Sequence, residues 1–402
     1  MPQYRYKAKD LSGRVVSGLV EAESEVGARN LLREKRFFVL ELKKSDGAVN
    51  SGFSFSFQRK LKAKDLALMA KQLGTMIAAG VPLLTAVNVL SRQVENKTLK
   101  KSLIRIEEKL RNGNTLSESL REEKIFPELM CSMVEVGEVG GVLDNVLDRL
   151  SLHYEKEAQL SEKIRSAMTY PMVVLFAAIA AVLVLVTYVL PQFTGILLQA
   201  NIELPLITQV VIKITNFFSQ HAATIFLTLG AIIGGLLYWF STPPGRKIRD
   251  QLSLNMPLIG TLVLKGIIAR FSRTMATLVQ GGVPMLQSLR VVQKTLGNGE
   301  MQKVLELAED KVREGESLAT FLAQSRWFPP LLTQMMLVGE ETGQLDAMLT
   351  KAADFYEAEV DAAVGRLSSI IEPVLILFMG GIVGLIIVSI MLPMFNMVNA
   401  VK

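Results

Sequence analysis

The side chains that most often carry catalysis or bind metal ions are scarce in this chain. It has two histidines, His153 and His221, and one cysteine, Cys131, among 402 residues. The membrane topology deduced below places the histidines on opposite sides, so they cannot share a metal ion or a catalytic triad. No G-x-x-x-x-G-K-[ST] sequence is present to hold ATP phosphates. We therefore expect no enzymatic activity, no cofactor and no metal site, with Cys131 as a small core residue.

Repeated carboxylates are the strongest polar candidates for contacting a partner. Glu138 and Glu340 each follow the glycine of the same Val-Gly-Glu sequence. Each can equally cap or neutralise the positive end of the next helix, a contribution of about 0.3–1 kcal/mol. A second acidic set precedes two apolar segments and either faces a basic partner or forms a solvated helix face; it comprises Glu155, Glu157, Glu357 and Glu359.

The chain contains one segment twice: residues 73–193 recur without a gap as residues 275–395, and we call these segments copy one and copy two. Glycine and proline dominate the identities, and both are selected where the backbone needs a special φ. Their recurrence at one spacing predicts one backbone path formed twice. The matching turn residues are Gly80, Pro82, Gly113, Pro127, Gly137 and Gly141, and then Gly282, Pro284, Gly315, Pro329, Gly339 and Gly343.

Three apolar segments predict transmembrane helices. Met172–Leu190, Ala222–Phe240 and Val374–Leu392 carry no charged side chain, and each approaches the ~20 residues that cross ~30 Å of hydrocarbon. Pro171 and Pro373 stand at the entrances of the first and third segments, where a long helix from the preceding bundle either bends or breaks. The alternative, three helices buried in a soluble core, would require unusually long helices that are apolar all round.

Basic side chains flank the apolar segments unequally. They gather before the first segment and after the second, as Lys156, Lys163, Arg165, Arg246, Lys247 and Arg249. This asymmetry predicts that both copies are cytoplasmic. Two copies of one module face the same compartment only if an even number of crossings separates them, and residues 222–240 supply the return crossing. The N-terminus is then cytoplasmic and the C-terminus lies on the opposite side.

The sequence thus predicts a mainly α integral membrane protein with three transmembrane helices, two homologous cytoplasmic helical bundles and a small α+β N-terminal domain. Residues 1–44 alternate like strands around a helical stretch, and residues 45–64 form a linker. The predicted order continues with the first bundle at 65–170, a span at 171–191, a short periplasmic segment at 192–221, a span at 222–240, the second bundle at 241–372, a span at 373–393 and a periplasmic tail at 394–402.

Charge and small residues narrow the kinds of partner. The formal charge is +6, but no stripe of interleaved arginine and aromatic residues appears, so we expect no nucleic acid. Ala177-x-x-x-Ala181 and Gly380-x-x-x-Gly384 predict close approach of helices, either within the chain or between chains. The spans hold no internal ionisable residue, which argues against a pump or channel. Glu372, next to the third span, is interpreted as solvated at the membrane surface.

These motifs resemble those of the PilC/GspF family, the polytopic inner-membrane platform proteins of type IV pilus assembly and type II secretion. The likeness covers nearly the whole chain. It rests on the Tyr6-Lys7-Ala8 opening, the Gly-Val-Pro turns, Phe-Pro at 126 and 328, Gly-Glu-x-x-Gly at 137 and 339, and residues 255–260. One departure is Gly140, where the family usually has Ser or Thr and copy two has Thr342.

The resemblance implies a non-enzymatic platform in the bacterial inner membrane, whose bundles contact a hexameric assembly ATPase. It also implies contact with pilins and other inner-membrane components, and a homo-oligomer, either a dimer or a trimer. Type IV pilus assembly, with the ATPase coupled to pilin insertion or removal, is the first expectation, and type II secretion with a pseudopilus is the alternative. A repeat-built transporter is less favoured, because such repeats place a polar site at mid-membrane.

Overall fold

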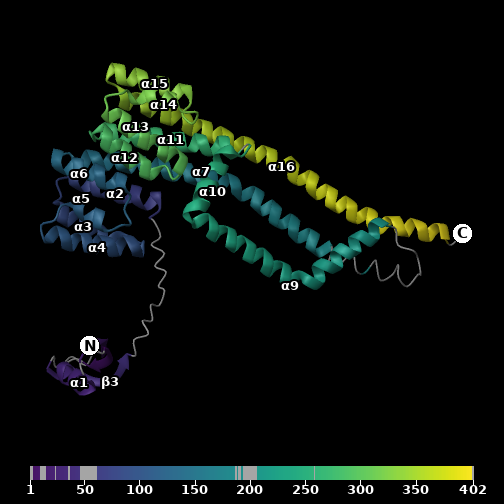
Figure 1. The fold of residues 1–402 in the computed structure, drawn as a ribbon, viewed down its shortest axis with the longest axis horizontal. Helices are drawn as coiled ribbons and strands as arrows, with labels where there is room; N and C mark the ends of the chain where they lie inside the picture. Colours follow the sequence, from purple (N-terminus) through teal and green to yellow (C-terminus); the bar gives the residue numbers. More distant parts are fainter. Residues whose placement is uncertain are drawn as a thin grey trace. The chain divides into compact units, whose positions relative to one another are not determined.

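The computed structural model (Figure 1) describes residues 3–9, 15–22, 24–34, 37–45, 61–185, 206–257 and 259–400, together with residues 188 and 192. The chain forms two compact units, Met1–Arg59 and Lys60–Lys402. Most of the predicted linker, residues 45–64, lies outside the described residues. The same holds for much of the predicted periplasmic segment 192–221 and for the end of the first predicted span.

The Met1–Arg59 unit contains a three-stranded antiparallel sheet and one helix. Its elements are β1 (Gln3–Lys9), β2 (Val15–Glu21), α1 (Glu25–Glu34) and β3 (Phe38–Ser45), with strand order β2-β1-β3. Tyr4, Ala22 and Ala28 form its buried cluster, and Leu42 packs against them. Ala8 and Leu32 are also buried among the described residues of this unit.

Copy one, taken from here on to include all of α2, forms a bundle of helices, two of which begin at a side-chain cap. Its helices are α2 (Ala63–Ala78), α3 (Leu83–Gln93), α4 (Lys97–Arg111), α5 (Leu116–Glu122), α6 (Glu128–Gly140) and α7 (Leu143–Val184). The Asn96 side chain accepts two N–H groups at the start of α4, and Thr115 forms a complete capping box with Glu118 at α5. Local sequence therefore determines where these helices begin.

Copy two, taken likewise to include all of α11, repeats this order helix for helix. Its helices are α11 (Ile259–Gln280), α12 (Met285–Thr295), α13 (Gly299–Arg313), α14 (Leu318–Ala323), α15 (Pro330–Thr342) and α16 (Leu345–Ala400). Between the copies lie α9 (Leu206–Ser241) and α10 (Pro243–Asn255). The bundles share one hydrophobic core, which includes Leu147 and Leu150 of α7 and Ile268 and Phe271 of α11.

The glycine turns have the same backbone in both copies. Gly80 and Gly282 adopt φ values of 81° and 79°, and Gly113 and Gly315 adopt 93° and 94°. These angles lie in the left-handed region, which side chains with a Cβ rarely enter. The structure thus confirms that one backbone path is formed twice.

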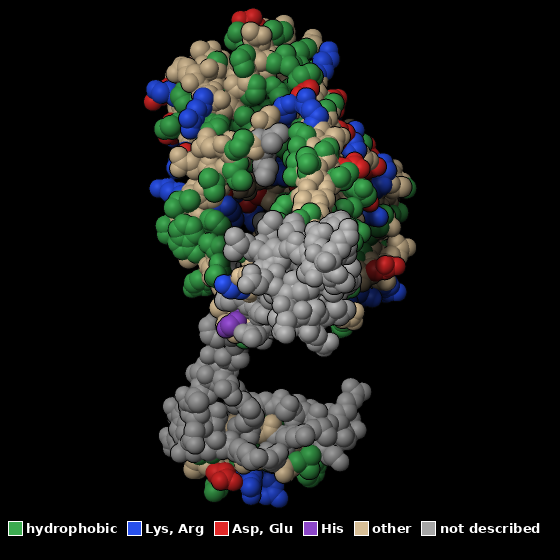
Figure 2. All heavy atoms as spheres, turned by 90° about the vertical axis from the view of Figure 1, so that its right-hand side faces the viewer, with side chains coloured by type: hydrophobic (Ala, Val, Ile, Leu, Met, Phe, Trp, Pro, Cys, Tyr) green, Lys and Arg blue, Asp and Glu red, His purple; other side chains and the backbone are tan. Residues whose placement is uncertain are grey.

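Two helices join the bundles to the apolar segments (Figure 1). α7 continues through Pro171 and α16 through Pro373, so neither proline ends its helix. Within the described residues, these two are long and apolar enough to cross a membrane as single helices. Figure 2, seen from the side toward which these helices run, shows both hydrophobic and charged side chains on the described surface. Exposure of Phe176 and Phe378, at 76% and 62%, suits a lipid environment.

The second predicted span, Ala222–Phe240, lies within α9. Within the described part of α9, Gly230–Ser241 is an apolar stretch shorter than a full span. Among the described residues, a third span is otherwise obtained only if α10 and α11, which meet at a bend of 103°, are joined into one. That joined pair is not a span, because Phe271 and Met275 of α11 are completely buried in the bundle core. The described helices therefore support two spans, one for each copy.

We predict that Gly80→Val destabilises the protein, because valine at a φ of 81° is strained by about 1–2 kcal/mol or more. The thermal midpoint of the detergent-solubilised full chain measures this effect. Gly266→Ala is the matched control: a Cβ there meets nothing within 4 Å and φ is helical, so a gain of about 0.5–1 kcal/mol is expected. Equal midpoints for wild type and Gly80→Val would contradict the strain argument.

Candidate functional site

The carboxylate of Glu138 caps the start of helix α5. Its Oε1 accepts the backbone N–H of Leu116 at 2.6 Å, and its Oε2 accepts the N–H and the hydroxyl of Ser117 at 3.0 and 2.6 Å. N–H groups in the first turn of a helix have no partner inside that helix. Glu138 therefore stabilises the helix that precedes it in the sequence, whereas the residues alone suggested the following helix.

Glu340 repeats this arrangement in copy two. Its Oε1 accepts the N–H of Ala319 at 3.2 Å, and the hydroxyl of Ser317 donates to its Oε2. Both residues belong to the start of α14, as Ser117 belongs to the start of α5. Both repeated carboxylates thus have an intramolecular role, and their contact with a partner stays a prediction.

The acidic residues that precede the third predicted span are paired inside copy two. Glu357 accepts a hydrogen bond from Nε of Arg273 at 2.8 Å, and Glu359 forms an ion pair with Lys265. Arg273 and Lys265 both lie on α11, so these pairs join α16 to α11. Because the side chains are only partly exposed, each pair ties two helices together and is less screened than a surface pair.

The corresponding acidic residues of copy one are arranged differently. Glu155 is exposed and accepts a hydrogen bond at 3.4 Å from Gln159, one turn along α7. Glu157 lines a cavity between the two copies. The two acidic pairs therefore occupy equivalent positions in the sequence but make different contacts. Their role toward a basic partner stays a prediction.

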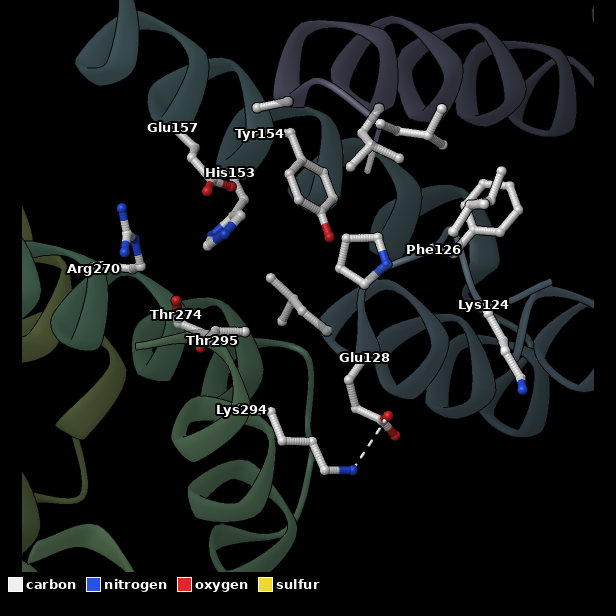
Figure 3. A pocket seen from close by; sticks show the side chains of 16 residues that line it. Lys124, Phe126, Glu128, His153, Tyr154, Glu157, Arg270, Thr274, Lys294 and Thr295 are labelled. Carbon is white, nitrogen blue, oxygen red and sulfur yellow. Dashed lines mark ion pairs between the residues drawn. The ribbon is translucent and has the colours of Figure 1, made fainter. Parts of the chain in front are cut away.

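Copy one and copy two meet where α6 and α7 approach α11 and α12 (Figure 3). Nδ1 of His153 lies 3.1 Å from Oγ1 of Thr277 in a buried contact. The Thr277 hydroxyl donates to the carbonyl of Arg273 at 2.8 Å. Its proton is thereby engaged, so Nδ1 of His153 is the donor in the contact between the copies.

A cavity of about 340 Å³ lies at this junction. Figure 3 shows His153 and Tyr154 of α7 on one wall and Arg270 and Thr274 of α11 on the opposite wall. An ion pair of 3.3 Å between Lys294 and Glu128 links α12 to the start of α6 beside the cavity. The cavity is therefore built by both copies and by neither alone.

Burial keeps His153 neutral. The loss of hydration lowers the pKa of its imidazole to about 3, and the positive charges of Arg273 and Arg270 act in the same direction. The residue stands well before the apolar segment that follows Pro171, in the part of α7 packed against α11. A neutral imidazole can donate through Nδ1 without placing a charge between the copies.

Cys131, in α6, is also buried, and the loss of hydration raises the pKa of its thiol to about 11. The group stays protonated at neutral pH and is a poor nucleophile. This environment agrees with its interpretation as a core residue.

An apolar groove of about 570 Å³ lies between α7 and α16, along their apolar segments. Ala177 borders it from α7 and Gly380 from α16, while Tyr170 and Glu372 lie at its end nearest the bundles. Among the described residues, a Cβ added to Gly380 would meet nothing within 4 Å. Of the predicted small residues, Ala177 and Gly380 therefore line an open groove and do not form a tight helix contact.

Comparison with known protein families matches the two copies separately. The sequence model described as "Type II secretion system (T2SS), protein F" matches residues 69–191 and again residues 271–393. The chain belongs to this family. A second model, described as "Type II secretion system protein F, N-terminal domain", matches residues 1–43. The family resemblance inferred from the motifs is thus confirmed, and the duplication is the one that the family model finds.

Relatives of known name align over the full length of this chain. A "Type IV pilus assembly protein PilC" of Thermus thermophilus is 40% identical over 404 residues, covering 100% of both chains. A protein of the same printed name from Myxococcus xanthus is 35% identical, covering 100% of this chain and 96% of its own. A "Type II secretion system protein F" of Pseudomonas aeruginosa is 33% identical, covering 99% of each.

Sequence reasoning did not identify the residues that join the copies. His153 was treated only as one of two histidines, and Arg270 and Lys294 were not singled out. A signal was nevertheless present, because Phe355 occupies the position of His153 in copy two and Leu68 occupies that of Arg270 in copy one. Differences between otherwise equivalent positions of a duplicated chain indicate surfaces with different neighbours.

We predict that Glu138→Gln destabilises copy one, because the amide replaces one acceptor oxygen with an NH₂ group that faces the donors of Leu116 and Ser117. Removing charge-assisted hydrogen bonds of this kind costs about 1–3 kcal/mol. Thermal unfolding of the full chain in detergent measures the loss. Glu162→Gln, on the exposed part of α7, is the control and should leave the midpoint unchanged; equal midpoints for both variants would contradict the cap.

We further predict that acid weakens the contact between the copies through His153. The unfolded histidine takes up a proton below about pH 6.5, whereas the folded one does so only near pH 3. The free energy of unfolding therefore falls as pH decreases from about 6.5 toward 3. His153→Gln keeps a donor but cannot titrate, so its midpoint should fall less between pH 7 and pH 5; parallel curves would rule out this contribution.

Proposed function

We propose that this chain is the inner-membrane platform protein of a type IV pilus assembly machine. In this role it couples a cytoplasmic hexameric assembly ATPase to the insertion or removal of pilin subunits. The observation that carries the proposal is the full-length match to proteins named for type IV pilus assembly. The two helical bundles, each continuous with an apolar helix, are the kind of body that such coupling requires.

The proposed topology has three transmembrane helices, with both bundles and the N-terminal α+β domain in the cytoplasm and the C-terminus in the periplasm. Basic residues before the first apolar segment and after the second support this orientation. The domain boundaries are those predicted from the sequence, from residues 1–44 to residues 394–402. No step in this role requires catalysis by the chain itself, because the partner ATPase supplies the chemical energy.

The structure suggests how displacement passes through the platform. α7 has 42 residues, or roughly 63 Å at 1.5 Å per residue. Its first part is buried in the bundle, and its later part carries the apolar surface. A bundle that is moved by the ATPase therefore moves its membrane helix as one body.

The groove between α7 and α16 supports a site for the pilin. Its lining is apolar apart from Tyr170 and Glu372 at one end. An apolar helix that carries a positive charge near its own end would satisfy both features. We propose that the membrane helix of a pilin subunit occupies this groove, with its cationic group near Glu372.

The second candidate is the equivalent protein of a type II secretion system, which acts on a pseudopilus. The Pseudomonas aeruginosa relative named for that system supports it, with 33% identity over 99% of both chains. Deletion of the gene separates the two candidates. Loss of surface pili with normal secretion supports the pilus assignment, loss of secretion with normal pili transfers the proposal to secretion, and no change in either contradicts both.

We predict that filling the groove abolishes assembly. Gly380→Leu places a side chain in the groove, so surface pili should fall at least tenfold when this variant complements the deletion strain. Gly381→Leu is the matched control, because this neighbouring glycine does not line the groove and is exposed. Immunoblotting of membranes checks that both variants are present at wild-type levels; normal piliation with Gly380→Leu would remove the groove from the mechanism.

A further inference from the structure

The two copies contact each other through unlike surfaces. Copy one contributes its α6/α7 face, with Met133 on α6 and His153 on α7. Copy two contributes its α11/α12 face, which includes Thr277 and Gly281. Contacts across this junction include the His153–Thr277 pair at 3.1 Å, a hydrogen bond of 2.7 Å from Arg149 to the carbonyl of Gln280, and the Lys294–Glu128 ion pair.

Because the chain is duplicated, each of these surfaces exists twice. The counterpart of the α6/α7 face is the α15/α16 face of copy two, with Met335 and Phe355. The counterpart of the α11/α12 face is the α2/α3 face of copy one, with Leu68, Gln72, Thr75, Ala79 and Arg92. In a twofold junction these two counterpart faces would lie against each other and be buried. Phe355, Leu68, Thr75 and Ala79 are instead exposed, while Met335 and Gln72 are half-buried.

Burial differs sharply between the equivalent positions. His153 is buried at 7% exposure, whereas its counterpart Phe355 is 45% exposed. Thr277 is likewise buried and its counterpart Thr75 is exposed. The junction is therefore heterologous: it uses one surface from each copy and leaves the complementary surface of each copy free.

We propose that the α15/α16 face of one chain docks on the α2/α3 face of a second copy of this chain, in the way that α6/α7 docks on α11/α12 inside the chain. The template for this contact is the internal junction itself. Both free faces have the backbone of the faces already joined, because the copies follow one path with matching turn angles.

The side chains of the free faces are complementary. In the internal junction, His153 and Arg270 both line the cavity. Their counterparts are Phe355 and Leu68, which are 45% and 58% exposed. Each free face therefore carries an apolar side chain where the joined face carries a polar one. Removing two large apolar side chains from water favours the contact between chains.

The α2/α3 face is also hollowed. A cavity of about 200 Å³ is lined there by Leu68, Gln72 and Gln93. The equivalent positions in copy two, Arg270, Thr274 and Thr295, form the wall on which copy one rests. The same hollow is therefore covered in copy two and open in copy one.

One position requires an adjustment. A Cβ on Gly281 would approach Sδ of Met133 to 2.5 Å, and the counterparts of this pair are Ala79 and Met335. The close atom is the end of a flexible methionine side chain, which has three rotatable bonds. Met335 must therefore adopt a different rotamer from Met133 in the contact between chains.

The contact is compatible with a shared membrane. The internal junction brings α7 beside α16, with an ion pair between Lys163 and Asp361 and a hydrogen bond from Ser368 to the carbonyl of Ala167 at 3.4 Å. These helices are equivalent and both continue into apolar segments. The same movement that superimposes copy one on copy two therefore places each new chain beside the last one in the same bilayer. If successive rotations return to the first chain, the chains form a ring.

Disulfide trapping between two different chains tests this arrangement. Both chains carry Cys131→Thr, the residue that copy two has at this position, and one carries Thr75→Cys while the other carries Phe355→Cys. Co-expressed in membranes and mildly oxidised, they should form a disulfide-linked dimer on non-reducing gels. The Thr75→Cys chain paired with Leu307→Cys, an exposed leucine of α13, should not.

Two outcomes of the trapping overturn the proposal. One is the absence of a dimer, or a yield no greater than that of the Leu307→Cys control. The other is efficient linkage between Phe355→Cys chains alone, which would indicate a twofold contact between identical faces.

A measurement of mass in detergent provides a second test that needs no cross-link. Phe355→Lys places a charge in the proposed contact, so its mass by light scattering should fall to that of one chain while wild type and Leu307→Lys remain larger. Circular dichroism checks that the helix content is retained. An unchanged mass for Phe355→Lys, or a wild-type protein of single-chain mass, would contradict the proposal.

Discussion

The Lys60–Lys402 unit depends on two helices that belong at once to a bundle and to an apolar segment. Leu147 and Leu150 of α7 are buried in the bundle core, while Met172 and Phe176 of the same helix are exposed. α16 shows the same division between Leu349 and Phe378. Hydrophobic burial thus holds one end of each rod in protein and favours lipid at the other. Because each of these helices is continuous, the orientation of its apolar part in the membrane also determines the orientation of its bundle.

Duplication places two equivalent rods in one chain without making the chain symmetric. α11 is enclosed by its own bundle on one side and by α6 and α7 of copy one on the other. Its counterpart α2 has only the first of these neighbours, so Thr75 is exposed where Thr277 is buried. An unequal junction of this kind leaves a chain with two different free surfaces, which is a basis for directional assembly.

Several charged groups in the described part of this protein join its own elements. Glu138 and Glu340 hold the starts of α5 and α14, and Arg273 joins α11 to α16 through Glu357. Helix ends need such acceptors because their first N–H groups lack partners within the helix. Part of the charge that resembles a docking surface in the sequence is therefore already engaged. The exposed Glu155 is the member of the acidic set whose surroundings leave it most open to a partner.

The sequence by itself determined the repeat, the helix boundaries and the apolar segments. Gly80, Thr115 and Pro127 act on their immediate neighbours, and hydrocarbon length limits each span, so local rules suffice for these features. Tertiary structure alone decided that Glu138 reaches back to α5, that His153 is buried against Thr277, and that Phe355 remains exposed. These outcomes depend on which helices meet: Glu138 lies 22 positions from Leu116 and His153 lies 124 positions from Thr277, and local patterns do not specify such contacts. Equivalent residues in the two copies thus acquired different surroundings through packing.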